Sequence, residues 1–173
     1  TEHSREDIIY KARFLKPHYG FRSDFGYSNI MFLTAGEIIP VVTGKSWDDF
    51  IKEKFFEPLG MVNSNTSIND FGENKNISMG HALVDGKYLP VDYINWDNVG
   101  PCGSVNSSVS DMTKWIMMQL NRGSYKDVEY FSEERSREMW QAITPLPVSK
   151  ANEELFPSTH FRSAGMGWFL YDY

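Results

Sequence analysis

The sequence predicts a mainly helical α+β fold with one small β-hairpin and a C-terminal strand. Three observations lead to this prediction. Four segments combine a helix start signal with apolar residues at helical spacing. In HALVDGKYLPV, two short alternating runs flank Asp85-Gly86, the strongest short hairpin signal that a sequence offers. The chain then ends in GMGWFLYDY, an aromatic run of strand type.

Composition describes an ordinary globular chain and excludes several partners. The 173 residues, 41% of them hydrophobic, are enough for a core that needs no disulfides. A net charge of -6 and the lack of any Lys/Arg run argue against a nucleic-acid partner. The longest apolar stretch, residues 30–42, is interrupted by polar residues and is too short for a transmembrane helix. The 15% aromatic content indicates a thick core or, less simply, an aromatic-lined cleft.

The first two predicted helices precede residue 44. Residues 4–15 form a short helix that Ser4 caps and whose first turn is acidic. A second helix covers residues 28–42, where Ala35 and Gly36 offer a flat surface for close packing. Pro40 weakens its last turn before Gly44. Because this segment is apolar on nearly every side, we expect it to be buried.

The segment KSWDDFIKEKFFEPLGM predicts the next helix. Ser46 and Asp49 form a capping box at its start, and Pro58 and Gly60 end it. One apolar face is expected, made of Trp47, Phe50, Ile51 and Phe55. Residues 63–76 are rich in Asn, Ser and Gly and are predicted to be a loop.

Two further helices follow the hairpin and the glycine-rich turn at residues 100–104. Ser108 and Asp111 repeat the capping box, and the expected apolar stripe is Met112, Trp115, Ile116 and Leu120. The last helix, residues 132–142, is expected to bury Met139 and Trp140. The C-terminal strand has no evident partner, which favours a chain that was cut at this point.

Most catalytic and cofactor signatures are missing. His3, His18, His81 and His160 are far apart and lack zinc-ligand spacing, so no metal site is expected. No phosphate-binding glycine loop is present. No Gly-x-Ser-x-Gly elbow occurs, and Ser104 in CGSVN is interpreted as a turn residue. The single cysteine, Cys102, excludes an internal disulfide and leaves the compartment open.

Tyr27 and Asn29 are the candidate site residues. A tyrosine just before a helix lies where the helix dipole favours negative charge, so it could act as a general base. Asn29 has both an amide donor and a carbonyl acceptor, which could hold a substrate amide and a neighbouring lysine together. The simpler alternative is a capping Ser28 beside a core tyrosine.

Four blocks in a fixed order decide between these interpretations. They are GYSNIMFLTAGEIIPVVTGKSWDDFIKEKFFEPLGM, SMGHALVDGKYLP, GPCGSVNSSVSDMTKWIMMQL and GMGWFLYDY. Together they resemble the serine β-lactamase and penicillin-binding protein family, in particular its class C-like branch, which includes esterases and D-amino-acid peptidases. The resemblance implies the helical central part of the β-lactamase/DD-peptidase-like fold.

The resemblance also implies roles. Tyr27 matches the tyrosine that accepts the nucleophile's proton, and Asn29 matches the asparagine that contacts the substrate amide and the catalytic lysine. The implied reaction is acyl transfer through a serine ester on an amide, lactam or ester, without a metal or organic cofactor. The implied partner is a small-molecule or peptide substrate, and a periplasmic or secreted location is favoured.

Two family motifs are missing. No serine of this sequence begins a Ser-x-x-Lys motif, and no Lys-Thr-Gly or His-x-Gly follows Trp168. His18-Tyr19-Gly20 fits His-x-Gly literally, but it precedes Tyr27 and is interpreted as chance. We therefore expect residues 1–173 to be a truncated central portion of a larger catalytic domain, inactive alone and prone to self-association. The alternative is a non-catalytic helical module that binds a peptide or another subunit.

Overall fold

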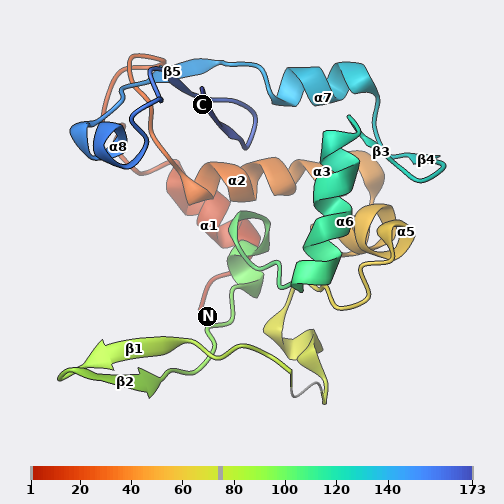
Figure 1. Cartoon of the computed structure of the whole chain (residues 1–173). Coiled ribbons are helices and arrows are strands. Elements are labelled where there is room, and N and C mark those ends of the chain that lie inside the picture. Colours follow the sequence, from red (N-terminus) through yellow and green to blue (C-terminus); the bar gives the residue numbers. More distant parts are fainter. Residues whose placement is uncertain (1, 74–75, 173) are drawn as a thin grey trace. The chain divides into compact units, whose positions relative to one another are not determined.

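The computed structural model describes residues 2–73 and 76–172 (Figure 1). Its residues form two compact units, and each is described by itself. The first unit combines Thr1–Lys16 with Ser28–Thr113, and the second combines Pro17–Tyr27 with Lys114–Tyr173. The helices of the first unit are α1 (Arg5–Ala12), α2 (Asn29–Gly36), α3 (Ile38–Thr43), α4 (Trp47–Ile51), the π-helix η1 (Lys52–Phe56), α5 (Glu57–Leu59), and the 3-10 helices η2 (Ile68–Phe71) and η3 (Asp97–Cys102).

Helix α1 begins as predicted. The Ser4 hydroxyl accepts a hydrogen bond from the Asp7 backbone, and the Asp7 carboxylate accepts one from the Ser4 backbone. This capping box satisfies two backbone donors that the first turn would otherwise leave unpaired. The helix ends at Ala12, earlier than the predicted residue 15.

The predicted helix 28–42 is two helices. Glu37 separates α2 from α3. Pro40, the third residue of α3, has no N–H with which the backbone hydrogen bonds of α2 could continue. Gly44 ends α3 with a left-handed φ of 71°, as expected of a C-terminal glycine. Leu33 and Gly36 in α2 are buried, but Val41 and Val42 in α3 are 83% and 71% exposed. The prediction that the whole segment is buried was therefore wrong for α3 and for much of α2, where Met31 and Phe32 are 57% and 39% exposed.

The segment after Ser46 is helical, and the helix type changes twice, from α4 to the π-helix η1 and then to α5. Ser46 caps α4 by accepting from the Asp49 backbone at 3.0 Å, and its hydroxyl donates to the Asp49 carboxylate at 2.6 Å. Pro58 lacks an N–H, and the residues before it run as the π-helix η1. α5 then ends at Gly60, where the Met61 N–H donates to the Phe56 carbonyl and the Gly60 N–H to the Glu57 carbonyl. The wider turn places Phe56 in the core, whereas the predicted Phe55 is only half-buried.

The predicted loop and hairpin are both present in the first unit. The loop contains η2, and residues 74 and 75 lie outside the described part. Strands β1 (His81–Val84) and β2 (Lys87–Pro90) pair antiparallel, with Val84 opposite Lys87 (Figure 1). Asp85 and Gly86 both have positive φ, 50° and 74°, which is the geometry of a type I′ turn.

Helix α6 (Val109–Leu120) starts in the first unit and continues in the second. Ser108 caps it through the Asp111 backbone, as predicted. The expected apolar stripe was wrong, since Ile116 and Leu120 are 51% and 64% exposed. The buried positions are instead Asp111, Met118 and Gln119. The Asp111 carboxylate accepts hydrogen bonds from the Asn63 backbone and the Ser64 hydroxyl.

The second unit combines the last part of α6 with two more helices and five strands of the described chain. Its elements are β3 (Ser124–Tyr125), β4 (Val128–Glu129), α7 (Glu133–Met139), β5 (Thr144–Leu146), α8 (Lys150–Leu155), β6 (Arg162–Ala164) and β7 (Phe169–Tyr171). β3 pairs with β4, and β5, β6 and β7 form an antiparallel sheet in that order.

Two predictions in this unit need correction. The C-terminal strand does have a partner, because Phe169 pairs with Ala164 across β6 and β7. Trp140 is not buried in a helix: it follows the end of α7, is 36% exposed and makes an edge-on contact with Trp168 at 5.7 Å. Met139 is half-buried. Helices with small antiparallel sheets nevertheless confirm the predicted α+β class.

Candidate active site

Tyr27 and Asn29 lie on either side of the residue that starts α2. Ser28 has extended backbone angles of -143° and 110°, and its side chain accepts a hydrogen bond from the Met31 N–H at 3.4 Å. Ser28 is therefore the N-cap, as the sequence indicated. Tyr27 directly precedes this cap, and Asn29 is the first residue of the helix.

Both candidate side chains are accessible. Tyr27 is 61% exposed, and Asn29 is also exposed. Backbone N–H groups without helical partners gather in the first turn of α2, where they favour negative charge. A tyrosine phenolate can accept a proton, and a side-chain amide can hold a substrate amide.

Helix α2 is anchored at its opposite end. A Cβ atom added to Gly36 would lie 2.3 Å from two ring carbons of Pro101 and 3.3 Å from Trp47. Only glycine therefore permits this approach of η3 to α2. This confirms the flat packing surface predicted for Gly36.

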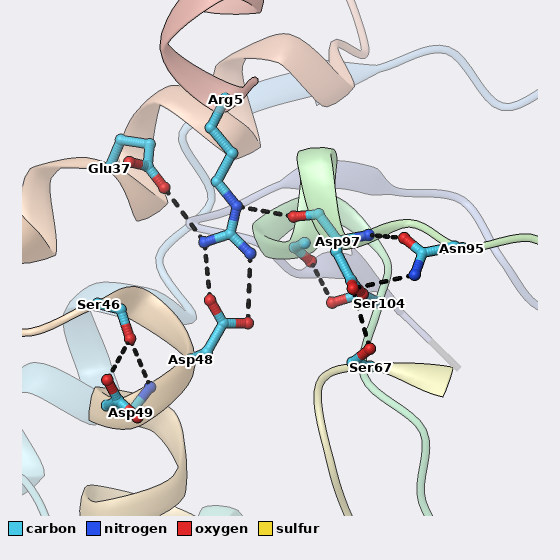
Figure 2. A network of polar contacts seen from close by, with 10 residues as sticks. Arg5, Glu37, Ser46, Asp48, Asp49, Ser67, Asn95, Asp97 and Ser104 are labelled. Carbon is cyan, nitrogen blue, oxygen red and sulfur yellow. Dashed lines mark hydrogen bonds and ion pairs between the residues drawn. The ribbon is translucent and has the colours of Figure 1, made fainter. Parts of the chain in front are cut away.

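Arg5 links α1 to three other elements of the first unit (Figure 2). Its Nε donates to the Asp97 carbonyl at 2.8 Å, and its Nη1 lies 2.9 Å from Asp48 and 3.4 Å from Glu37. The guanidinium also lies over the Trp47 ring at 5.7 Å from its centroid. These contacts connect α1 with α4, η3 and the residue between α2 and α3.

Asp97 is the centre of a second group of polar contacts that the sequence did not reveal. Its Oδ2 accepts from the side chains of Ser67, Asn69 and Asn95 at 3.0–3.2 Å. Its Oδ1 is buried and accepts no hydrogen bond from the described residues. The only local signal was the Asn-x-Asp spacing of Asn95 and Asp97, which also occurs in ordinary turns.

A pocket of about 200 Å³ lies beside Asp97 within the first unit. Its wall combines apolar and polar side chains, including Ile68, Tyr93, Trp96, Asp97, Ser104 and Asn106. Ser104 is buried, and its hydroxyl donates to the Gly100 carbonyl at 3.1 Å. This is the turn role that the sequence predicted for Ser104.

The other sequence candidates do not form a site of their own. His18-Tyr19-Gly20 lies in a stretch of turns, where the Tyr19 hydroxyl donates to the Phe25 carbonyl at 3.3 Å. Within residues 2–73 and 76–172, no group of three or more His, Cys, Asp or Glu side chains could hold a metal ion. Over the same residues, no helix is both long and apolar enough to cross a bilayer.

The profile of the Beta-lactamase family matches residues 1–173. This chain belongs to the beta-lactamase family. Penicillin-binding protein 4 of Amycolatopsis lactamdurans is 28% identical over 155 residues, which are 85% of this chain and 38% of that protein. The unguisins hydrolase ungD' of Aspergillus campestris is 29% identical over 148 residues, 84% of this chain and 27% of that protein.

Solved structures of the family have the same fold. The octameric penicillin-binding protein homologue from Pyrococcus abyssi superimposes with a TM-score of 0.78 and 26% identity, over 97% of this chain and 35% of that one. The D-amino acid amidase from Ochrobactrum anthropi SV3, in complex with L-phenylalanine amide, gives 0.74 and 19% identity, over 100% of this chain and 47% of that one. Residues 1–173 thus span between about a quarter and a half of these proteins.

Proposed function

We propose that this chain is the part of a serine hydrolase catalytic domain that carries the Tyr-x-Asn motif. The main support is the position of Tyr27 and Asn29 on either side of the Ser28 cap of α2, in a chain of the beta-lactamase family. The hydrolase reacts with an amide, lactam or ester by acyl transfer.

In this reaction, Tyr27 accepts the proton of the nucleophilic serine as that hydroxyl attacks the substrate carbonyl. Tyr27 reacts as its phenolate, so the transfer leaves a neutral phenol and the negative charge passes to the former carbonyl oxygen of the substrate. Asn29 contacts the substrate amide and orients it for attack. The serine and its lysine, and the last strand motif, come from segments outside residues 1–173, because this sequence has no Ser-x-x-Lys.

The first experiment measures turnover by the purified 173 residues. A chromogenic β-lactam and a p-nitrophenyl ester are the substrates, and a fluorophosphonate probe reports any reactive serine. We expect no turnover above the buffer rate and no labelling. Serine-dependent hydrolysis would contradict the proposal that the nucleophilic serine and its lysine lie outside residues 1–173.

The second candidate function is the non-catalytic helical module. It is favoured by α3, whose Ile38, Val41 and Val42 are all more than half exposed. This candidate predicts that the gene encodes no Ser-x-x-Lys before Thr1. Translating the flanking gene sequence separates it from the hydrolase, which requires that motif.

Self-association is part of the proposal for the isolated chain. Exposed apolar side chains on α3 favour contact between copies, and the Pyrococcus abyssi homologue is octameric. Size-exclusion chromatography with light scattering should give a mass above 20.0 kDa that rises with concentration. A concentration-independent monomer would contradict self-association without affecting the proposed chemistry.

A further inference from the structure

We propose that the pocket beside Asp97 binds a small organic ammonium ion attached to an apolar or aromatic group. The proposal concerns the folded first unit and does not depend on whether the chain takes part in catalysis. It rests on the charge of Asp97, the aromatic residues of the pocket wall and the size of the pocket.

Among the described residues, the Asp97 carboxylate forms no ion pair with a cationic side chain. Its Oδ2 accepts three hydrogen bonds, all from the neutral side chains of Ser67, Asn69 and Asn95. Its Oδ1 is buried without a donor among the described residues. An acceptor left without a donor costs free energy, and Asp97 is one of the residues that line the pocket.

The nearest guanidinium does not neutralise this carboxylate. Arg5 donates to the backbone carbonyl of Asp97 and forms its ion pairs with Glu37 and Asp48 (Figure 2). Within the described part of the first unit, the Arg5 guanidinium pairs with Glu37 and Asp48 and leaves the Asp97 carboxylate without an ion pair. The resulting field favours a cation in the pocket and opposes an anion.

The rest of the pocket wall suits an organic cation. Trp96 is 48% exposed and Tyr93 is 40% exposed, so both rings remain accessible to a ligand. Tyr93 is held in place, because its hydroxyl donates to the Ser78 carbonyl at 2.8 Å and its ring contacts Phe71 at 5.3 Å. Aromatic rings attract ammonium groups through their faces, and Ile68 adds an apolar surface.

The pocket also limits the kind of cation. A metal ion would need several oxygen ligands, and Asp97 is the one carboxylate among the described residues that line this pocket. The volume of about 200 Å³ corresponds to about seven water molecules, which is room for a phenyl ring with a short arm. A primary ammonium on a small apolar group therefore fits both the charge and the size.

The test compares benzylamine, charged at pH 7, with benzyl alcohol, its neutral counterpart of similar size. Binding to the 173-residue chain is followed by calorimetry and by NMR shifts of the Trp96 indole. We expect benzylamine to bind at least about tenfold more tightly, with an affinity that falls as salt is added. Equal affinities, or no binding of benzylamine at 20 mM as a rough upper limit, would overturn the proposal.

Three variants assign the binding to this pocket. Asp97→Asn should reduce the affinity for benzylamine to that for benzyl alcohol. Asp70→Asn is the matched control, because it removes the same charge from an exposed position in η2 and should leave both affinities within about twofold.

If Asp97→Asn does not fold by circular dichroism, Trp96→Ala serves instead and should abolish the binding of both probes. Equal effects of Asp70→Asn and Asp97→Asn, or unchanged binding in Trp96→Ala, would overturn the proposal.

Discussion

The buried carboxylate of Asp111 connects two chain segments of the first unit. It is 1% exposed, and its Oδ2 accepts from the Asn63 backbone at 2.7 Å and from the Ser64 hydroxyl at 3.0 Å. These bonds hold the loop after α5 against the start of α6.

Replacing Asp111 by alanine should therefore be costly. We expect Asp111→Ala to lower the free energy of unfolding by about 2–3 kcal/mol, because two donors lose a charged acceptor. Asp49→Ala is the control, since Asp49 has the same position after a capping serine but is exposed, and its loss should be about 1 kcal/mol or less. Urea denaturation measures both. Equal losses would show that the buried contacts of Asp111 contribute little.

At the residue scale, the sequence predicted contacts that are local in the chain. Ser4, Ser28 and Ser46 cap helices as expected, because a cap depends on residues two or three positions away. The partners of Asp97 and Asp111 could not be predicted in this way. Ser67 lies 30 residues from Asp97, and Ser64 lies 47 residues from Asp111, so these contacts appear only in the folded chain.

At the scale of elements, the packing of η3 on α2 depends on Gly36. Gly36→Ala places a methyl group 2.3 Å from the Pro101 ring. Such overpacking costs about 1–3 kcal/mol, reduced by about 1 kcal/mol from the higher helix propensity of alanine. We expect a net loss of up to about 2 kcal/mol in thermal or urea denaturation.

Gly103→Ala provides the control for this packing. A Cβ atom at Gly103 meets nothing within 4 Å, and its φ of 175° is extended backbone open to any residue. The expected change is within about 0.5 kcal/mol. A Gly103→Ala variant as unstable as Gly36→Ala would contradict the close approach at Gly36.

Helix α7 gives an element-scale prediction for pH. Hydrogen bonds from Arg137 and then from Arg122 hold the pKa of the Glu133 carboxyl below its ordinary value of 4.5. Because the folded pKa is the lower one, the stabilisation is present above about pH 4.5 and is lost as the pH falls through the folded pKa. Glu133→Gln should therefore be less stable than the unsubstituted chain at pH 7, and this difference should narrow below pH 4.5.

The measurement is a series of urea denaturations between pH 7 and pH 4. Glu134→Gln is the control, since it removes an acid from the same first turn and leaves both arginine contacts of Glu133 in place. A stability difference for Glu133→Gln that does not change with pH would exclude the ion pairs as its source.

The boundaries of elements were harder to predict than their existence. The sequence predicted the hairpin at Asp85-Gly86 because its turn chemistry is specific. It missed the break at Glu37 and the π-helix η1, which depend on how the chain accommodates the missing N–H groups of Pro40 and Pro58. It also missed the pairing of β7, because β6 carries no strong strand signal.

At the scale of the whole molecule, the sequence identified the family from four blocks in order. Residues 1–173 match that family throughout, and the fold agrees with its solved structures. The pocket beside Asp97 was not predicted, because it is assembled from residues between 68 and 106 that no single motif connects. The roles of Tyr27 and Asn29 remain predictions from the motif.

The most direct test of these roles is the kinetics of the full-length gene product with Tyr27→Phe. Removing a general base should lower kcat by about 10²- to 10⁴-fold, with unchanged thermal stability. Tyr19→Phe, which removes the hydroxyl of a neighbouring tyrosine, should leave kcat unchanged. A Tyr27→Phe enzyme with the unsubstituted kcat would contradict the assignment of Tyr27 as the proton acceptor.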